Sequence, residues 1–205
     1  MTRRSILIAA FALALALLVL GGDWLRIALT TSRVPEQSSS SSAQIGGPFT
    51  LIDTSGKTVT DQTYRGKWLL IYFGYTFCPD ACPTALNNMS IALQKFGSEA
   101  EKLQPLFITV DPRRDTPQVM ADYLKSFDSR IIGLTGTQAQ IDSVAMAYRV
   151  YVAPQKGDGE DYLIDHSAYF YLVNPQGKFV NVIAGAAAGD QLADKLRTMM
   201  VYPGT

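Results

Sequence analysis

Uninterrupted apolar runs and apolar residues at helical spacing alternate along the chain from Phe49 onward. The runs Trp68–Phe73 and Leu106–Val110 are apolar almost throughout, which is typical of strands covered on both faces. Ile131–Thr135 predicts a third strand of this kind. Before them, two short extended segments flank a turn around Thr54–Lys57 and predict a β-hairpin. The pattern therefore indicates a sheet with a hairpin at its N-terminal side.

Segments with helical spacing follow each of the three buried strands. The first is expected to open at Pro83, because the first turn of a helix has no use for the missing N–H. Thr116 and Thr137 are expected to cap the next two helices, and Pro117 fits the first position after its cap. The apolar positions expected to face inward on these three helices are Leu86, Met89, Ile91, Leu93, Phe96, Val119, Met120, Tyr123, Leu124, Phe127, Ile141, Val144, Ala145, Met146 and Tyr148.

The C-terminal part predicts a second hairpin and a closing helix. Ala168–Val173 and Phe179–Ile183 flank Asn174–Gly177, which has the composition of a tight turn. A helix is expected over Gly189–Met200. Parallel strands joined by helices and followed by an antiparallel pair give an α/β thioredoxin-like fold with an extra N-terminal hairpin. We assign this domain to residues 48–205.

The N-terminal residues predict export. Arg3 and Arg4 precede the uncharged apolar run Ile6–Leu20, which is shorter than the roughly 20 residues of a spanning helix. Gly21, Gly22 and Trp24 extend it toward spanning length, with the positive end cytoplasmic. Residues 1–30 are therefore interpreted as one transmembrane anchor. The alternative is a cleaved signal peptide, because Ala28–Thr30 loosely resembles a cleavage site.

Both interpretations place the remainder of the chain outside the cytoplasm. The run Ser38–Ser42, flanked by Pro35, Gly46 and Gly47, predicts a flexible linker over residues 31–47. We expect a single-pass protein of a bacterial-type inner membrane, with the domain on the periplasmic side. The formal net charge is zero, so nothing in the charge balance suggests a nucleic-acid partner.

The chain has two cysteines, Cys78 and Cys82, directly after the first buried strand. A disulfide across so short a loop would contribute only about 2 kcal/mol, which disfavours a purely structural bridge. The i, i+4 spacing at a helix start puts both sulfurs on one side and favours thiolates. A redox-active dithiol and a soft-metal site both remain open. Two thiolates select Cu(I) over hard cations, with zinc as the competing metal.

The chain has one histidine, His166, immediately before the strand Ala168–Val173. If that strand joins the same sheet as Trp68–Phe73, its beginning can approach the cysteine loop. A Cys/Cys/His metal site and a dithiol without metal are then evenly balanced alternatives. Asp165 is expected to be a solvated loop residue rather than an acceptor that orients the imidazole.

Several strings together resemble a known family. They are Gly66-Lys67-Trp68, Phe73-Gly74-Tyr75-Thr76-Phe77-Cys78-Pro79-Asp80-Ala81-Cys82-Pro83, Val110-Asp111-Pro112-Arg113-Arg114-Asp115-Thr116-Pro117 and Asp165-His166-Ser167. In this order they resemble the Sco/SenC proteins, membrane-anchored copper chaperones with a thioredoxin-like fold. The resemblance covers roughly Gly47 to Met200.

The resemblance implies that Cys78, Cys82 and His166 bind a copper ion as Cu(I) or Cu(II). It further implies that the protein helps to assemble the binuclear copper site of cytochrome c oxidase subunit II. A copper-donor chaperone and a thiol reductant are expected as further partners. Two roles are equally expected for Asp80: it tunes the loop or contacts the partner, or it is simply an exposed turn residue. Asp111, Arg113, Arg114 and Asp115 are expected to form a capping and ion-pair network rather than a partner surface.

The alternative to a metallochaperone is a thiol–disulfide oxidoreductase that acts on the same partner without metal, through the redox-active pair Cys78 and Cys82. A peroxidase is disfavoured, because Pro79 follows the first cysteine in a setting unlike that of a peroxidatic cysteine. The methionines form no copper-binding run, and Met89, Met120 and Met146 are expected in helix cores.

Overall fold

The computed structural model describes residues 45–155 and 162–201. The predicted anchor at residues 1–30 and the predicted linker up to residue 44 lie outside the described residues. Within the part that is described, no helix combines the length and apolar character needed to cross a bilayer.

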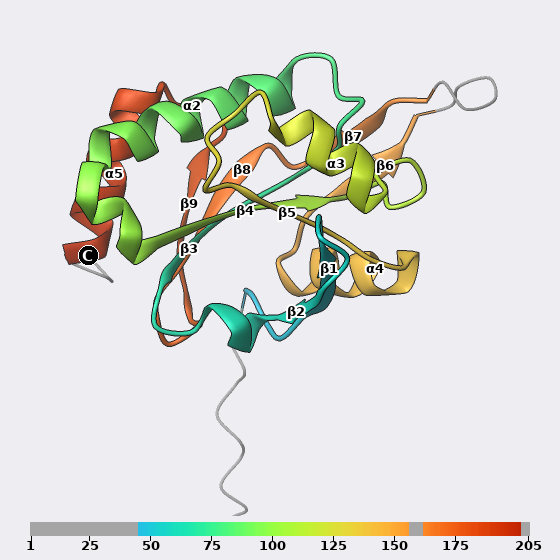
Figure 1. The fold of residues 1–205 in the computed structure, drawn as a ribbon, viewed down its shortest axis with the longest axis horizontal. Coiled ribbons are helices and arrows are strands. Elements are labelled where there is room, and N and C mark those ends of the chain that lie inside the picture. Colours follow the sequence, from blue (N-terminus) through green and yellow to red (C-terminus); the bar gives the residue numbers. More distant parts are fainter. Residues whose placement is uncertain (1–44, 156–161, 202–205) are drawn as a thin grey trace, which may run out of the picture. The chain divides into compact units, whose positions relative to one another are not determined.

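The described residues form a seven-stranded mixed sheet and a separate two-stranded one (Figure 1). Along the larger sheet the strand order is β2-β1-β5-β4-β3-β8-β9. The strands are β1 (Thr50–Asp53), β2 (Thr58–Thr60), β3 (Trp68–Gly74), β4 (Leu103–Thr109), β5 (Ile132–Thr135), β6 (Val152–Pro154), β7 (Ile164–His166), β8 (Tyr169–Val173) and β9 (Phe179–Ala184).

The three central strands β3, β4 and β5 are parallel, as the sequence predicts. β8 pairs antiparallel with β3, and Tyr72 lies opposite Phe170. The C-terminal end of β3 therefore meets the beginning of β8. Both hairpins, β1–β2 and β8–β9, are confirmed. The sequence did not predict β7, which pairs with β6 rather than with the larger sheet.

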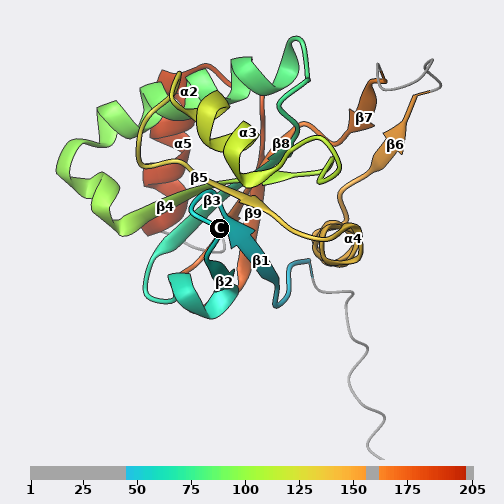
Figure 2. The same cartoon turned by 45° about the vertical axis from the view of Figure 1, so that its right-hand side comes forward.

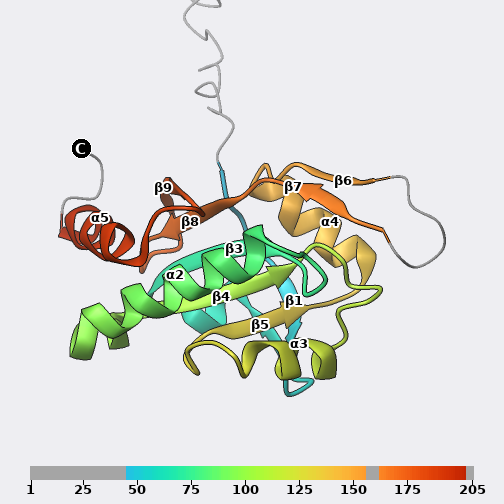
Figure 3. The same ribbon diagram turned by 90° about the horizontal axis from the view of Figure 1, so that it is seen from above.

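The helices are α2 (Ala81–Phe96), α3 (Pro117–Leu124), α4 (Gln138–Ala147) and α5 (Gly189–Val201), with short 3₁₀ turns η1 (Asp61–Tyr64) and η2 (Gly97–Lys102). α2, α3 and α5 lie on one face of the sheet and α4 lies on the other (Figures 1 and 2). Seen from above, the β6–β7 pair projects beyond the larger sheet (Figure 3).

The predicted helix caps are confirmed. The side chains of Thr116 and Thr137 accept hydrogen bonds from the backbone N–H groups of Val119 and Gln140, both at 3.3 Å. The predicted start of α2 at Pro83 is wrong, because the helix begins at Ala81. All N–H groups of the first turn lack a partner within the helix, so proline fits its third position as well as its first.

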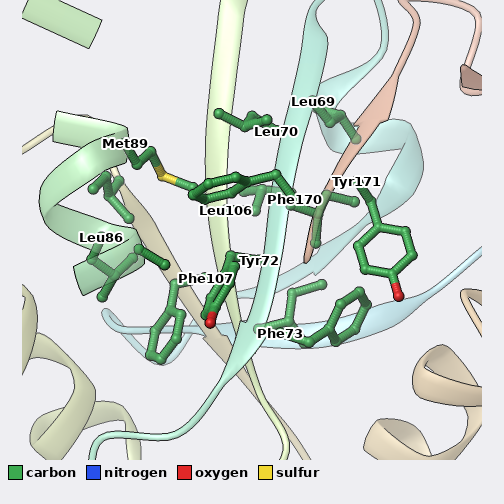
Figure 4. Close-up of a cluster of buried hydrophobic side chains, with 14 of the residues drawn as sticks. Leu69, Leu70, Tyr72, Phe73, Leu86, Met89, Leu106, Phe107, Phe170 and Tyr171 are labelled. Carbon is green, nitrogen blue, oxygen red and sulfur yellow. The ribbon is translucent and has the colours of Figure 1, made fainter. Parts of the chain in front are cut away.

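The core is built on β3, whose residues Leu70 to Phe73 have no exposed surface. Leu86 of α2 points toward Tyr72 and Phe107 and Met89 toward Phe170, whereas Phe73 and Tyr171 lie on the other side (Figure 4). Met89 and Met120 are buried as predicted. The prediction for Met146 is wrong, because its side chain is 78% exposed. The inward stripe of α4 runs through Ile141, Val144 and Ala145, and Met146 falls off that stripe.

Candidate metal centre

The two cysteines lie where β3 gives way to α2. Cys78 belongs to the loop between these elements and is partly buried, whereas Cys82 is the second residue of α2 and is fully buried. Both are free thiols. The Cys78 sulfur accepts a hydrogen bond of 3.4 Å from the backbone N–H of Cys82. That N–H is one of the unpaired donors of a helix start, and such donors favour a thiolate.

His166 reaches the cysteines from the end of β7. Its Nε2 atom lies 3.5 Å from the sulfur of Cys82. Its Nδ1 atom lies 3.2 Å from the carbonyl oxygen of Ser167, which can only accept a hydrogen bond. A proton on Nδ1 would satisfy this carbonyl and leave the lone pair of a neutral imidazole on Nε2. That is the nitrogen that faces the sulfurs.

The two sulfurs and one ring nitrogen lie within 4.8 Å of one another. The structure thus brings Cys78, Cys82 and His166 together, as the sequence led us to expect. The expected route is also correct, because antiparallel pairing of β3 and β8 brings the segment before β8 to the end of β3. Two soft thiolates and one neutral imidazole form a donor set suited to a thiophilic transition metal.

The pKa values of the two thiols are shifted in opposite directions. A hydrogen bond from Cys82, helped by His166 and by backbone N–H groups, outweighs burial and holds the pKa of Cys78 far below its usual range. The same bond to Cys78, together with burial, raises the pKa of Cys82 well above its usual range. Without metal, the pair is therefore expected to carry one thiolate, on Cys78, and one thiol.

Aromatic rings surround the site on its inner side. The rings of Tyr72 and Tyr75 meet the imidazole of His166 edge to face, with centroid distances of 6.2 and 5.8 Å. The Tyr75 hydroxyl accepts a 3.1 Å hydrogen bond from the backbone N–H of Ile164 and so ties β7 to the end of β3. Burial raises the pKa values of Tyr72 and Tyr123 well above their usual range, which keeps both phenols neutral.

A buried carboxylate holds the cysteine loop in shape. Asp115 accepts hydrogen bonds from the backbone N–H of Thr76 at 3.0 Å, from the Thr76 hydroxyl at 2.5 Å and from the Thr109 hydroxyl at 2.6 Å. The sequence predicted a hydrogen-bond and ion-pair network at this segment, but not that Asp115 would bind Thr76 in the cysteine loop. No local spacing links Asp115 to Thr76, which is 39 residues away.

The structure also shows where the other charged residues singled out in the sequence lie. Asp111 is buried and pairs with Arg114, as expected, whereas Arg113 is exposed. Asp165 is exposed as expected and accepts a hydrogen bond from Gln155 rather than from His166, but it lies in strand β7 and not in a loop. Asp80 is exposed beside Cys78, which fits either of the two roles considered for it.

Gly74 allows Cys82 to approach the strand. A Cβ atom at this position would lie 2.7 Å from the Cys82 sulfur and 2.8 Å from a ring carbon of Phe107. Both distances are too short for real atoms, and the Phe107 ring is locked in the core. The position therefore has to be glycine for the sulfur to sit against the end of β3.

The fold and the site define a class: a thioredoxin-like domain that presents two thiols and one imidazole where its central strand ends. A family model described as SCO1/SenC matches residues 37–201 of this chain. The chain belongs to the SCO1/SenC family.

Curated relatives agree with this assignment. The chain is 48% identical over 153 residues to Protein SCO1 homolog 2, mitochondrial, of Arabidopsis thaliana, covering 74% of this chain and 55% of the relative. It is 43% identical over 159 residues to the human Protein SCO1 homolog, mitochondrial, covering 76% and 53%. The chain thus spans about half the length of the curated relatives it matches.

Solved structures show the same fold. The structure of Bradyrhizobium japonicum ScoI with copper bound superposes with a TM-score of 0.71 at 45% identity, covering 75% of this chain and 98% of that one. Yeast Sco1 with copper bound gives a TM-score of 0.72 at 40% identity, covering 78% and 90%. Relatives with this fold therefore bind copper.

We expect Gly74→Ala to damage the site. The added methyl group must displace the Cys82 sulfur or the Phe107 ring, so the free energy of unfolding should fall by about 1–3 kcal/mol. Cys82 should also react faster with an alkylating agent in the native state. Gly47→Ala is the control, because its Cβ would meet its nearest neighbour at an ordinary 3.5 Å. An unchanged alkylation rate would show that the close approach does not position Cys82.

We expect the reduced, metal-free protein to keep one thiolate at a pH about two units below the ordinary thiol pKa of about 8.5. Because the pKa of Cys78 is lowered, this thiolate persists as the pH falls and disappears only when the pH passes the lowered pKa. Ultraviolet absorbance of the thiolate measures it. Cys78→Ser should abolish the signal, and joint titration of both thiols near the ordinary value would contradict the prediction.

Proposed function

We propose that this protein binds one copper ion through Cys78, Cys82 and His166 and hands it to a copper enzyme. The observation that carries the proposal is the convergence of two sulfurs and one imidazole nitrogen within 4.8 Å of one another. Copper bound to relatives of the same fold supports the choice of metal.

The donor set fits both oxidation states of copper. Two thiolates suit Cu(I), and an imidazole adds the nitrogen that Cu(II) needs. The ring is already oriented for this role by the Ser167 carbonyl and by the two tyrosine rings. Cys78 offers a preformed thiolate, and binding would release the proton that Cys82 retains.

We infer that the recipient is the binuclear copper site of cytochrome c oxidase subunit II. The family resemblance of the cysteine and histidine strings supports this partner. Copper can be held by the pair only while both cysteines are reduced, so a thiol reductant is proposed as a further partner. A copper-donor chaperone is proposed as the source of the metal. The proposed topology is an anchor at residues 1–30, a linker at 31–47 and a domain at 48–205 on the periplasmic side of a bacterial-type inner membrane.

A thiol–disulfide oxidoreductase that acts on the cysteines of the same partner is the second candidate. The opposite pKa shifts of the two thiols favour this function. Disulfide exchange uses one thiolate that attacks the partner's disulfide, here Cys78, and one thiol that then resolves the mixed disulfide, here Cys82. In that function His166 would contribute only to the pKa of Cys78 and to packing.

His166→Ala distinguishes the two functions. Substitution of a residue that only orients a metal ligand costs about 10–100-fold in metal affinity. Loss of the ligand itself should therefore weaken Cu(II) binding by at least about 100-fold. The measurement is a copper titration of the full-length protein in both oxidation states, with Asp165→Asn as the control at the neighbouring exposed carboxylate.

Copper chaperone function requires that His166→Ala fail to support oxidase assembly in cells and that added copper restore it. An oxidoreductase without metal requires that the same variant support assembly at low copper. Full retention of Cu(II) affinity by His166→Ala would refute the three-ligand site.

A further inference from the structure

We propose that a stack centred on Arg114 positions His166 and thereby sets how strongly the site prefers Cu(II) to Cu(I). The Arg114 stack consists of Arg114, the rings of Phe77 and Tyr162, and the carboxylate of Asp111. This inference rests on the proposed function and extends it to residues that do not touch the metal.

The guanidinium group of Arg114 packs against aromatic rings from two segments. Its central carbon is 3.7 Å from the ring centroid of Tyr162 and 4.7 Å from that of Phe77. The same group pairs with Asp111, and the Tyr162 hydroxyl donates a 2.8 Å hydrogen bond to the other oxygen of that carboxylate. Contact with ring faces and a charged partner together hold a guanidinium group firmly.

The two segments joined by Arg114 are the ones that carry the candidate ligands. Phe77 directly precedes Cys78 in the loop after β3. Tyr162 precedes β7, at whose end His166 lies. Arg114 itself comes from the turn between β4 and α3. The stack therefore spans the gap between the thiol side and the imidazole side of the site.

On its C-terminal side His166 is followed closely by β8 of the larger sheet, but on its N-terminal side its position depends on such contacts because β7 lies outside that sheet. Its strand partner is β6, in the separate two-stranded sheet. Near Ile164, the described contacts to the main body include the hydrogen bond to Tyr75 and the bond from Tyr162 to Asp111. Both bonds end on the segments that surround the cysteine loop.

The two sulfurs depend on different constraints. They are held by the first turn of α2, by Gly74 and by the bonds from Thr76 to Asp115. Loosening the Arg114 stack should move the imidazole more than the thiolates. Two thiolates suffice for Cu(I), whereas Cu(II) also needs the nitrogen. The stack therefore acts selectively on Cu(II).

The test is Tyr162→Phe in the full-length protein, which keeps the ring over Arg114 and removes the bond to Asp111. We expect Cu(II) affinity to fall about tenfold, in line with other residues that orient a metal ligand, and Cu(I) affinity to change less than about twofold. The Cu(II)/Cu(I) reduction potential should rise accordingly, and the thiolate-to-Cu(II) charge-transfer band should shift.

Tyr151→Phe is the matched control, because Tyr151 lies beside β6 and its side chain is 63% exposed. Phe77→Leu tests the second ring of the stack at an exposed position and should give the same selective loss. Equal losses for both oxidation states, or no difference from Tyr151→Phe, would overturn the inference. If the unmodified protein binds no copper, the proposed function itself fails, and the two failures are thus separable.

Discussion

The site depends on one buried carboxylate. The loop that carries Cys78 makes few backbone bonds of its own, and Asp115 replaces them by accepting two hydrogen bonds from Thr76 and one from Thr109. A buried acceptor satisfied in this way fixes its donors, because leaving any of them unpaired costs free energy. The end of β3, the end of β4 and the start of α3 thus meet at a single residue, and the cysteine loop takes its shape from it.

Around this constraint, the site divides into a half attached to the larger sheet and a half carried by the separate β6–β7 pair. The sulfur of Cys82 sits on the start of a helix and against the bare backbone of Gly74. The imidazole of His166 sits on a two-stranded hairpin that the Arg114 stack and Tyr75 connect to the body. This division is consistent with the proposed carrier function, in which copper would have to be held securely and also released.

Much of the fold could be predicted from the sequence because its signals are local. The apolar runs of β3 and β4 and the caps Thr116 and Thr137 need only neighbouring residues to be recognised. β7 was missed because Ile164-Asp165-His166 is too short to show alternation, and the start of α2 was missed because proline fits several positions of a first turn. The links from Asp115 to Thr76 and from Tyr162 to Asp111 join residues 39 and 51 apart, and no sequence spacing reveals them.

The separation of the three candidate ligands along the chain has a consequence for biosynthesis. Cys78 and Cys82 are neighbours from the moment they are made, but His166 lies 84 residues beyond Cys82. The nitrogen can join the sulfurs only after β4, β5 and β6–β7 have been synthesised and the chain has closed a long loop. An unfinished or misfolded chain therefore presents the two thiols without the imidazole of His166. The complete set of three donors forms only when the domain has folded.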